Sequence, residues 1–424
     1  MAAEKVSPLT LLFKPAARST ICSVSTASGA TTSNQVSTTG LAASPLRSTP
    51  ESRGLPLWAV GAIEIPRTGT SEQYPLPVAD HTYPPGTLVN DRYEFLEGLG
   101  RGTFGEVYRV WDKHLDSECA LKLLTPQRGQ PADWTEARLL ERTRSDFLVP
   151  INNADVVINS DIRFITMPVM EGGDLNALAH PHGVEVRQAL RWGQQLAHAL
   201  DRVHAEGLVH RDVKPGNAFL SEGNALLGDL GTAVFVDPQT GLAPAIGTTA
   251  TLAPEAVPQH GHTARASDVY SLAASVFYLL SGEYPIDARL PDVEQRRRVA
   301  AGDRRKLRDL APHVSRSIAT VVEKGMSTNP GDRHESALAL GNALAGASDH
   351  PRSWRRVVHA GHAHCLEGAR LGRPTISICV ESVGSKLRAT ARGALGRRPR
   401  GLQDVEVGQT GLPQVLRRWT ESLR

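Results

Sequence analysis

Apolar residues recur at regular spacings in the middle of the chain, and these spacings predict its main elements. Tyr93–Leu99 and Glu106–Trp111 are predicted to be the two strands of a hairpin, because a glycine-rich turn separates them. The mostly apolar stretch Phe164–Met167 predicts a buried strand. Val184–Glu206 has the 3.6-residue period of a buried helix. The apolar positions of this helix include Ala189, Leu190, Leu196, Ala197 and Leu200.

The two flanks lack such periods over most of their length. Residues 1–85 are rich in Ser, Thr, Ala, Pro and Gly, a composition typical of disorder, and we expect the disordered segment to reach residue 90. Beyond about Ala345, Gln414–Leu423 has the spacing of a short amphipathic helix. The predicted parts are therefore a disordered segment 1–90, a folded domain 91–345 and a tail 346–424.

Composition excludes some classes of protein. The formal net charge of +3 is too small to indicate nucleic-acid binding. The chain has 4 cysteines without C-x-x-C spacing, so we expect free thiols in a reducing compartment, the cytoplasm. Cys119 is expected to be a small packed residue. No apolar run approaches the roughly 18 residues that cross a bilayer.

The segment His210–Asn217 carries the most informative chemistry. Its sequence, His-Arg-Asp-Val-Lys-Pro-Gly-Asn, fits the pattern H-R-D-x-K-x-x-N. Asp212 can accept a hydroxyl proton, Lys214 can neutralise a phosphate and Asn217 can bind a metal ion. The segment resembles the catalytic loop of the eukaryotic-type (Hanks-type) Ser/Thr protein kinases, and the high Ala, Arg and Gly content favours a bacterial member. The resemblance implies that the folded domain is a protein kinase catalytic domain.

A second motif, Gly100–Val107, resembles the glycine-rich loop G-x-G-x-x-G-x-V of that family. Without side chains, the backbone amides of such a loop can approach the phosphate oxygens of ATP. A strand follows these glycines, whereas a dinucleotide-binding fold would need a helix. The resemblance assigns ATP binding to Leu99, Gly100, Gly102, Gly105 and Val107.

The segment Cys119–Lys122 resembles the V-A-I-K strand of the family. Lys122 would contact the α- and β-phosphates, and a carboxylate on a helix would hold its ammonium group. We select Glu136 as that carboxylate, because it opens an apolar-periodic helix at the expected distance. Glu141 is the alternative, and either residue could instead lie on a solvated helix face.

The tripeptide Asp229-Leu230-Gly231 stands where the family has D-F-G. The resemblance implies that Asp229 and Asn217 hold Mg²⁺, for which Mn²⁺ could substitute, and that ATP is the phosphoryl donor. Leu230 has much the same apolar volume as the usual phenylalanine. We expect this change to affect the balance of active and inactive states more than the chemistry.

The nucleotide base is expected at the link between two lobes. By analogy with the family, Met167 lies at the back of the pocket, the Pro168 carbonyl accepts a hydrogen bond from adenine, and the Met170 N–H donates one. Proline lacks an N–H, so it can stand only where an acceptor suffices. Ala120 and Phe219, with Val107, are candidates for the apolar walls, and each could equally be ordinary core.

The segment Gly247–Glu255 resembles the family pattern G-T-x-x-x-x-A-P-E, which docks the substrate. In the family, Thr248 would bond to the catalytic Asp and Lys, and Glu255 would pair with a distant arginine, here Arg333. Asp268 matches the aspartate that braces the catalytic loop. We interpret Glu255, Asp268 and Arg333 as structural residues.

Regulation is suggested by Arg211, which in many such kinases binds a phosphate on the activation segment. Between Asp229 and Gly247, the hydroxyl residues are Thr232 and Thr240. Thr232 follows the metal motif too closely to move freely, so Thr240 is the predicted phosphosite. The alternative is that Thr240 is an ordinary loop residue.

The tail carries two clusters without a clear function. Four neighbouring residues (His359, His362, His364 and Cys365) suggest a metal site, but the standard zinc spacing and a second cluster are missing, so we expect none. The basic stretch predicts a disordered, solubilising tail rather than a docking site for an acidic protein or nucleic acid. Its residues are Lys386, Arg388, Arg392, Arg397, Arg398 and Arg400.

Together the motifs predict an α+β, two-lobed protein-kinase-like fold, with a five-stranded antiparallel sheet and one helix in the smaller lobe and a larger, mainly helical lobe. The predicted function is γ-phosphoryl transfer from ATP to Ser and Thr hydroxyls of proteins, including autophosphorylation, which a dimer would permit. A pseudokinase is one alternative, which only Leu230 suggests. A small-molecule kinase of the aminoglycoside phosphotransferase type is another, but such enzymes usually lack the glycine-rich and A-P-E motifs.

Overall fold

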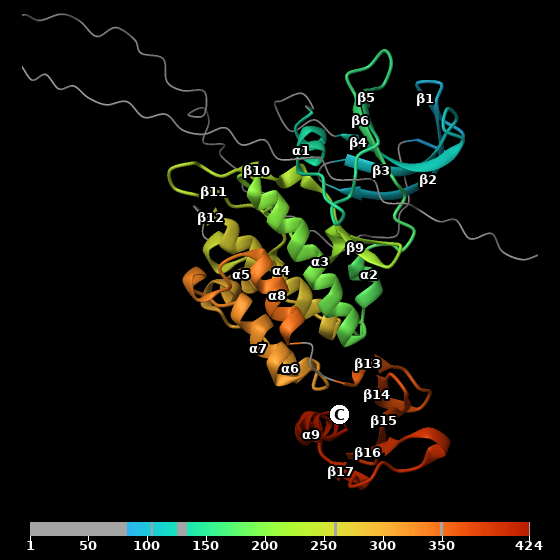
Figure 1. The fold of residues 1–424 in the computed structure, drawn as a ribbon, viewed down its shortest axis with the longest axis vertical. Coiled ribbons are helices and arrows are strands. Elements are labelled where there is room, and N and C mark those ends of the chain that lie inside the picture. Colours follow the sequence, from blue (N-terminus) through green and yellow to red (C-terminus); the bar gives the residue numbers. More distant parts are fainter. Residues whose placement is uncertain (1–82, 103–104, 125–133, 258–260, 348–350, 424) are drawn as a thin grey trace, which may run out of the picture. The chain divides into compact units, whose positions relative to one another are not determined.

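The computed structural model describes residues 83–102, 105–124, 134–257, 261–347 and 351–423 (Figure 1). The predicted disorder of residues 1–82 lies outside these ranges. The described chain forms a curled antiparallel sheet with one helix, then a mainly helical region, then a second antiparallel sheet with a helix. The first two parts confirm the predicted two-lobed fold.

The smaller lobe is an antiparallel sheet with the strand order β1-β2-β3-β4-β6-β5. Among the described residues this sheet has six strands and not the expected five, because Leu88–Val89 pairs with the start of β2. The elements are β1 Leu88–Val89, β2 Tyr93–Gly102, β3 Gly105–Asp112, β4 Ser117–Leu124, α1 Thr135–Thr143, β5 Asn153–Val156 and β6 Arg163–Met167.

Aromatic side chains fill one face of this sheet. The rings of Phe95 and Tyr108 meet edge to face with centroids 4.5 Å apart, and the ring of Tyr83 lies 5.3 Å from that of Phe95. Such contacts bury a large apolar area and fix the segment that carries Tyr83. The prediction that disorder extends to residue 90 is therefore wrong for residues 83–90, which belong to the folded lobe.

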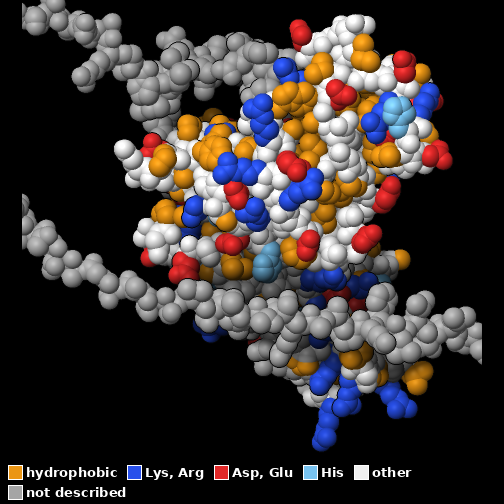
Figure 2. All heavy atoms as spheres, turned by 45° about the horizontal axis from the view of Figure 1, so that its top comes forward, with side chains coloured by type: hydrophobic (Ala, Val, Ile, Leu, Met, Phe, Trp, Pro, Cys, Tyr) orange, Lys and Arg blue, Asp and Glu red, His pale blue; other side chains and the backbone are white. Residues whose placement is uncertain are grey.

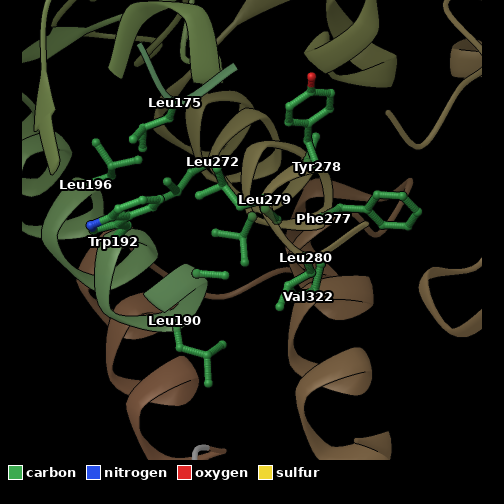
Figure 3. Close-up of a cluster of buried hydrophobic side chains, with 14 of the residues drawn as sticks. Leu175, Leu190, Trp192, Leu196, Leu272, Phe277, Tyr278, Leu279, Leu280 and Val322 are labelled. Atoms are coloured by element: carbon green, nitrogen blue, oxygen red, sulfur yellow. The ribbon is translucent and has the colours of Figure 1, made fainter. Parts of the chain in front are cut away.

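The larger lobe is built around two helices, α3 and α4, that pack against each other. The first confirms the helix predicted from the apolar period, and the second is buried along most of its length. Figure 3 shows Trp192 of α3 and Leu272 and Leu279 of α4 in one cluster. Because α2, α3, α7 and α8 pack around α4, the whole stretch from Ser267 to Ser281 is buried. The helices are α2 Leu175–Ala179, α3 Val186–Ala205, α4 Arg265–Ser281, α5 Asp292–Ala301, α6 Leu307–Leu310, α7 Arg316–Gly325 and α8 Ala337–Gly346.

Short two-stranded ladders position the loops of the larger lobe. β7 pairs with β10, β8 with β9, and β11 with β12. Since β7 ends directly before His210 and β9 ends shortly before Asp229, these ladders bring the two loops to one end of the lobe. The strands are β7 Leu208–Val209, β8 Ala218–Ser221, β9 Asn224–Leu227, β10 Val234–Phe235, β11 Ala243–Pro244 and β12 His262–Thr263.

The tail is folded, which corrects the prediction of disorder. Its strands form an antiparallel sheet in sequence order, and its last helix confirms the predicted amphipathic helix at Gln414–Leu423. The elements are β13 Ser353–Val357, β14 His362–Arg370, β15 Arg373–Val383, β16 Lys386–Arg392, β17 Val405–Val407 and α9 Leu412–Ser422.

Alternation of side chains explains how this C-terminal domain (residues 351–423) holds together. On β16, Leu387 and Ala389 are buried, and Trp419 of α9, which contacts β16, is 1% exposed. The intervening basic residues are paired with acids. Arg388 lies 2.7 Å from Glu406, and Arg392 and Arg398 lie 2.9 and 2.8 Å from Asp404. These ion pairs offset the repulsion between the basic side chains, so the stretch can form part of a folded sheet.

Acidic and basic side chains are interspersed over the described part of the face shown in Figure 2. This mixture agrees with the small net charge of +3. Within the described ranges, no helix is both long enough and apolar enough to span a membrane.

Candidate active site

A buried charge cluster lies where β4 meets α1 and the loop after β9. The Lys122 ammonium donates to Glu136 Oε1 at 2.7 Å and to Asp229 Oδ1 at 2.9 Å. Glu136 lies in the first turn of α1, on the face that carries the buried Leu139 and Leu140. Glu141 is exposed and pairs with Arg144. The structure thus brings Glu136, and not the alternative Glu141, to Lys122.

Lys122 stabilises the charges of both carboxylates, but burial and the nearby Asp229 carboxylate still raise the pKa of Glu136. Burial by itself lowers the pKa of Lys122, but the carboxylates of Glu136 and Asp229 outweigh it and raise the pKa. Burial likewise favours a raised pKa for Asp229, but the ammonium of Lys122 outweighs it and lowers the pKa. Lys122 is therefore a cation and Asp229 an anion at neutral pH.

Asp229 stands in a strained backbone conformation. Its φ of 58° is in the left-handed region, at the start of the 3₁₀ turn Leu230–Thr232. Leu230 is 1% exposed and belongs to the core of the larger lobe. Packing of Leu230 into the core thereby holds the carboxylate of Asp229 toward Lys122.

A second cluster surrounds Asp212. Its Oδ1 accepts from the Thr248 hydroxyl at 2.7 Å, and its Oδ2 lies 2.8 Å from Lys214 Nζ and 3.0 Å from Asn217 Nδ2. Lys214 also donates to the Thr248 hydroxyl at 2.8 Å. Both carboxylate oxygens are therefore held by donors, which fixes the orientation of Asp212.

The two clusters are joined through the backbone. The Asn217 carbonyl accepts from the Gly228 N–H at 2.8 Å, one residue before Asp229. Because Asn217 uses its Nδ2 to bind Asp212, its side-chain oxygen is left as a ligand atom for a cation. Asp229, which uses Oδ1 for Lys122, has its second oxygen for the same purpose.

The catalytic loop is braced from below by Asp268 of α4, which is 1% exposed. Its carboxylate accepts from the backbone N–H groups of His210 and Arg211 at 2.8 and 2.9 Å and from the His204 ring at 2.8 Å. Arg211 has a φ of 72°, so these bonds stabilise a backbone turn that a free chain rarely adopts.

Glu255 and Arg333 form a bidentate ion pair with both contacts at 2.7 Å. The Arg333 side chain is fully buried and also lies over the ring of Tyr270. Ser267 donates to Glu255 as well, at 2.7 Å. These contacts join Glu255, at the end of the activation segment (residues 229–255), to α4 and to the loop before α8.

The glycines of the loop between β2 and β3 differ in their surroundings. A Cβ on Gly105, whose φ is +147°, would lie 1.9 Å from the Leu123 carbonyl oxygen. A Cβ on Gly100 or Gly102 would meet no atom of the described residues within 4 Å. Packing therefore requires Gly105 but does not require the other two. Leu99, beside them, is 41% exposed.

The expected lining of the nucleotide pocket lies on adjoining strands. Val107 is the cross-strand partner of Lys122, and Ala120 is that of Met167. Pro168 and Met170 follow at the end of β6, where the Met170 carbonyl accepts from the Gly173 N–H at 2.9 Å. Phe219 of β8 lies against Gly228, where an added Cβ would be 3.0 Å from the ring. Val107, Ala120 and Met167 thus lie on or beside the strand that carries Lys122, and Phe219 lies beside the loop that carries Asp229.

Comparison with known families decides what kind of site this is. Residues 93–342 match the protein kinase domain family. The chain belongs to the protein kinase family. This match extends over more than half of the chain and covers all the catalytic and structural residues predicted above.

Curated relatives of this kinase include bacterial Ser/Thr protein kinases. It is 35% identical over 281 residues to serine/threonine-protein kinase PknD of Mycobacterium tuberculosis, which covers 61% of this chain and 40% of PknD. It is 32% identical over 270 residues to PknK of Mycobacterium bovis, with coverage of 61% and 24%. It is 30% identical over 272 residues to the DNA damage-responsive kinase RqkA of Deinococcus radiodurans, with coverage of 62% and 40%. The chain thus spans well under half of the length of these relatives.

The activation segment of the kinase is held by Arg211. Its guanidinium donates to the carbonyls of Thr232 and Pro244 at 2.6 and 3.0 Å, on either side of Thr240. Burial lowers the pKa of Arg211 to about 10, so it stays charged at neutral pH. Thr240 is exposed in a turn whose Asp237 accepts from its N–H at 2.8 Å and its hydroxyl at 3.1 Å.

Some contacts of the kinase site were not expected from sequence. One is the contact of Lys122 with Asp229, and another is the hydrogen bond between His204 and Asp268. In both, the two residues are more than sixty positions apart in the sequence. The position of His204, eight residues after Leu196 in the predicted buried helix, could have indicated that its side chain has a buried polar partner. Nothing in the spacing of Lys122 and Asp229 indicated their contact.

Proposed function

We propose that this kinase transfers the γ-phosphoryl group of ATP to Ser and Thr hydroxyls of proteins, including its own. The observation that carries the proposal is the double cluster: Asp212 held by Lys214, Asn217 and Thr248, and Lys122 held by Glu136 and Asp229. The names of the bacterial relatives support Ser and Thr as acceptors.

The residues present fit ATP and a divalent cation. The described residues leave room for a side chain at Gly100 and at Gly102. Glycine at these positions is explained if the phosphates of ATP lie over this backbone. Within the described residues, Asn217 Oδ1 and Asp229 Oδ2 accept no hydrogen bond, and such oxygens are hard ligands of the kind that Mg²⁺ prefers. We assign Mg²⁺ to these two residues, with Mn²⁺ as a substitute, and adenine to the Pro168 carbonyl and the Met170 N–H.

The chain's own groups would then act by position and charge. When bound, ATP supplies the transferred phosphoryl group and Mg²⁺ neutralises part of its charge. Asp212 orients the acceptor hydroxyl and takes its proton late, because an aspartate carboxylate is a weak base at neutral pH. Lys214 and Lys122 offset the negative charge on the phosphates.

Two rival functions are less well supported. A pseudokinase would be expected to lack a charged group in one of the clusters, whereas Leu230, the residue that departs from the family, contacts the apolar core. A small-molecule kinase would not need the buried Glu255–Arg333 pair, which positions the segment that docks protein substrates in the family.

We further propose that the kinase phosphorylates itself at Thr240, that a dimer permits this, and that the kinase is cytoplasmic. Thr240 is exposed between the two carbonyls that Arg211 holds, so a phosphate there could compete for this guanidinium. The Asp237 carboxylate beside it would repel the phosphate and so favour movement of the segment.

The decisive experiment is transfer of labelled phosphate from Mg²⁺-ATP by the wild type and two variants. Asp212→Asn should lower turnover by about 10²- to 10⁴-fold while ATP still binds. Asp201→Asn, on α3 outside both clusters, is the matched control and should behave as wild type. Phosphosite mapping on the wild type then tests Thr240. Unchanged turnover in Asp212→Asn would refute the assignment of Asp212.

A further inference from the structure

A histidine turn opens the second strand of the C-terminal domain. The His362 N–H donates to the His359 carbonyl at 3.1 Å, and Gly361 between them has a φ of +80°. A turn of this kind needs a residue without a Cβ at its third position. The turn places both histidines at its ends, and their ring centroids lie 5.8 Å apart.

An irregularity in the sheet puts His362 on the same face as Cys365. Residues three apart on a regular strand point to opposite faces. Here the register with β15 shifts between His362 and His364, so that His362 pairs with Glu381 and Cys365 pairs with Cys379. Because Cys379 and Glu381 are two apart, they share a face, and the shift brings His362 onto it.

The side chains of these residues converge. His359 Nδ1 lies 3.3 Å from Cys379 Sγ, and His362 Nδ1 lies 3.3 Å from Cys365 Sγ. The four ligand atoms all lie within 4.8 Å of one another. In a tetrahedral zinc site, bond lengths of about 2.0 Å to nitrogen and about 2.3 Å to sulfur put those atoms roughly 3.5 Å apart. The cluster is close to that spacing.

On each of the two histidines, a carboxylate lies near Nε2, the ring nitrogen that faces away from the cysteines. His362 Nε2 lies 3.3 Å from Glu381 Oε1, and His359 Nε2 lies 3.8 Å from Glu367 Oε1. A carboxylate on the far nitrogen holds a proton there and so leaves Nδ1 as an electron-pair donor toward the cysteines. The His362 ring is thus oriented for metal binding through Nδ1, and the more distant Glu367 carboxylate favours the same orientation of the His359 ring by its charge.

We propose that His359, His362, Cys365 and Cys379 bind one Zn²⁺ ion. Two thiolates and two imidazoles suit Zn²⁺, whereas Mg²⁺ and Ca²⁺ prefer oxygen ligands. With four protein ligands the site has no open position, so its role is structural: it fastens the β13–β14 turn to β15. The side chains of His359 and His362 are 37% and 25% exposed, which gives the ion access.

Metal content of the full chain, purified under reducing conditions, tests this proposal. We expect one zinc per chain in the wild type. Exchange with Co²⁺ should give the intense visible bands of tetrahedral cobalt and a thiolate-to-cobalt charge-transfer band.

Matched variants separate the site from the fold. Cys379→Ser and His359→Gln should lose stoichiometric zinc, whereas His364→Gln, an exposed neighbour outside the group, should keep it. Glu381→Gln should weaken zinc binding by about 10-fold through the second-shell contact. Glu406→Gln, an acid paired with Arg388 in the same domain, should leave the affinity unchanged.

Three results would overturn the proposal. One is wild-type protein that contains no zinc and fails to take up Co²⁺ with a thiolate band. Another is full zinc content in a folded Cys379→Ser variant. The third is a native Cys365–Cys379 disulfide, which would lower the mass of the isolated chain by two hydrogens and leave no thiolates for the metal.

Discussion

At the scale of single residues, Lys122 shows how a short motif acquires its chemistry from its surroundings. One ammonium faces two carboxylates, Glu136 and Asp229, so the cluster has an excess of negative charge in a largely buried place. Such an excess favours a further cation, which supports the proposed metal site beside Asp229.

Glu136 can be tested against its sequence alternative. Glu136→Gln should lower kcat/KM for phosphate transfer by about 10- to 100-fold, because the lost charge-assisted contact contributes about 1.5 to 3 kcal/mol. Glu141→Gln, which changes an exposed carboxylate on the same helix, should transfer phosphate at the wild-type rate. Steady-state kinetics with a protein substrate measure both. Equal losses in the two variants would contradict the assignment of Glu136.

At the scale of elements, long-range polar contacts hold the catalytic loop and the activation segment in place. Asp268 on α4 accepts a hydrogen bond from the Arg211 N–H, next to Asp212. Arg333, in the loop before α8, binds Glu255 at the end of the activation segment. These residues are far apart in the sequence, so the active site depends on the packing of α3, α4 and α8.

The Glu255–Arg333 pair predicts a dependence of stability on pH. Burial by itself raises the pKa of Glu255, but Arg333 outweighs it and holds the pKa below the ordinary value. Its contribution is therefore complete above the ordinary pKa of about 4.5 and is lost as pH falls through the lower, folded value. Glu255→Gln should cost about 3 kcal/mol at pH 7, because it leaves Arg333 buried without its partner.

Thermal unfolding of wild type and Glu255→Gln between pH 7 and acidic pH measures this effect. The difference in Tm should be constant near neutrality and shrink in acid. Glu294→Gln, which removes only surface contacts to Arg297 and Arg298, should leave Tm nearly unchanged at every pH. A difference in Tm that grows in acid would refute the assigned sign.

At the scale of the whole molecule, the described chain contains a kinase domain and a folded C-terminal domain. Hydrogen bonds connect them: Arg187 of α3 donates to the Pro351 carbonyl at 3.0 Å, and Arg417 of α9 donates to the Arg308 carbonyl at 2.6 Å. The charge clusters around Lys122 and Asp212 both lie within the kinase domain, so stability of the C-terminal domain and phosphate transfer should be separable.

Trp419 tests this separation. Trp419→Ala should destabilise the C-terminal domain by about 4 kcal/mol, since the side chain is 1% exposed. Arg418→Ala, at an exposed neighbouring position on α9, should be nearly neutral. Calorimetry and phosphate transfer on the full chain give the two readouts. Loss of transfer in Trp419→Ala, with the kinase domain still folded, would show that the two domains act together.

The sequence by itself was enough to propose the chemistry of the kinase domain, because each motif places its polar groups within a few consecutive residues. It also determined α3 and α9, whose apolar periods are long enough to be recognised. The strands β13–β17 were not predicted, although β14 and β15 are 9 and 11 residues long. The basic residues along β16 favoured a disordered tail, because an acidic partner such as Glu406 lies on another strand.

Tertiary structure decided which distant residues meet. Packing left the alternative Glu141 exposed, placed Asp229 on Lys122 and folded Tyr83 onto Phe95. The sequence cluster around His359 included His364, but the register of β14 and β15 replaced it with Cys379, fourteen residues beyond Cys365. Strand pairing acts between residues that no local pattern relates, and a shift of one position changes which side chains share a face.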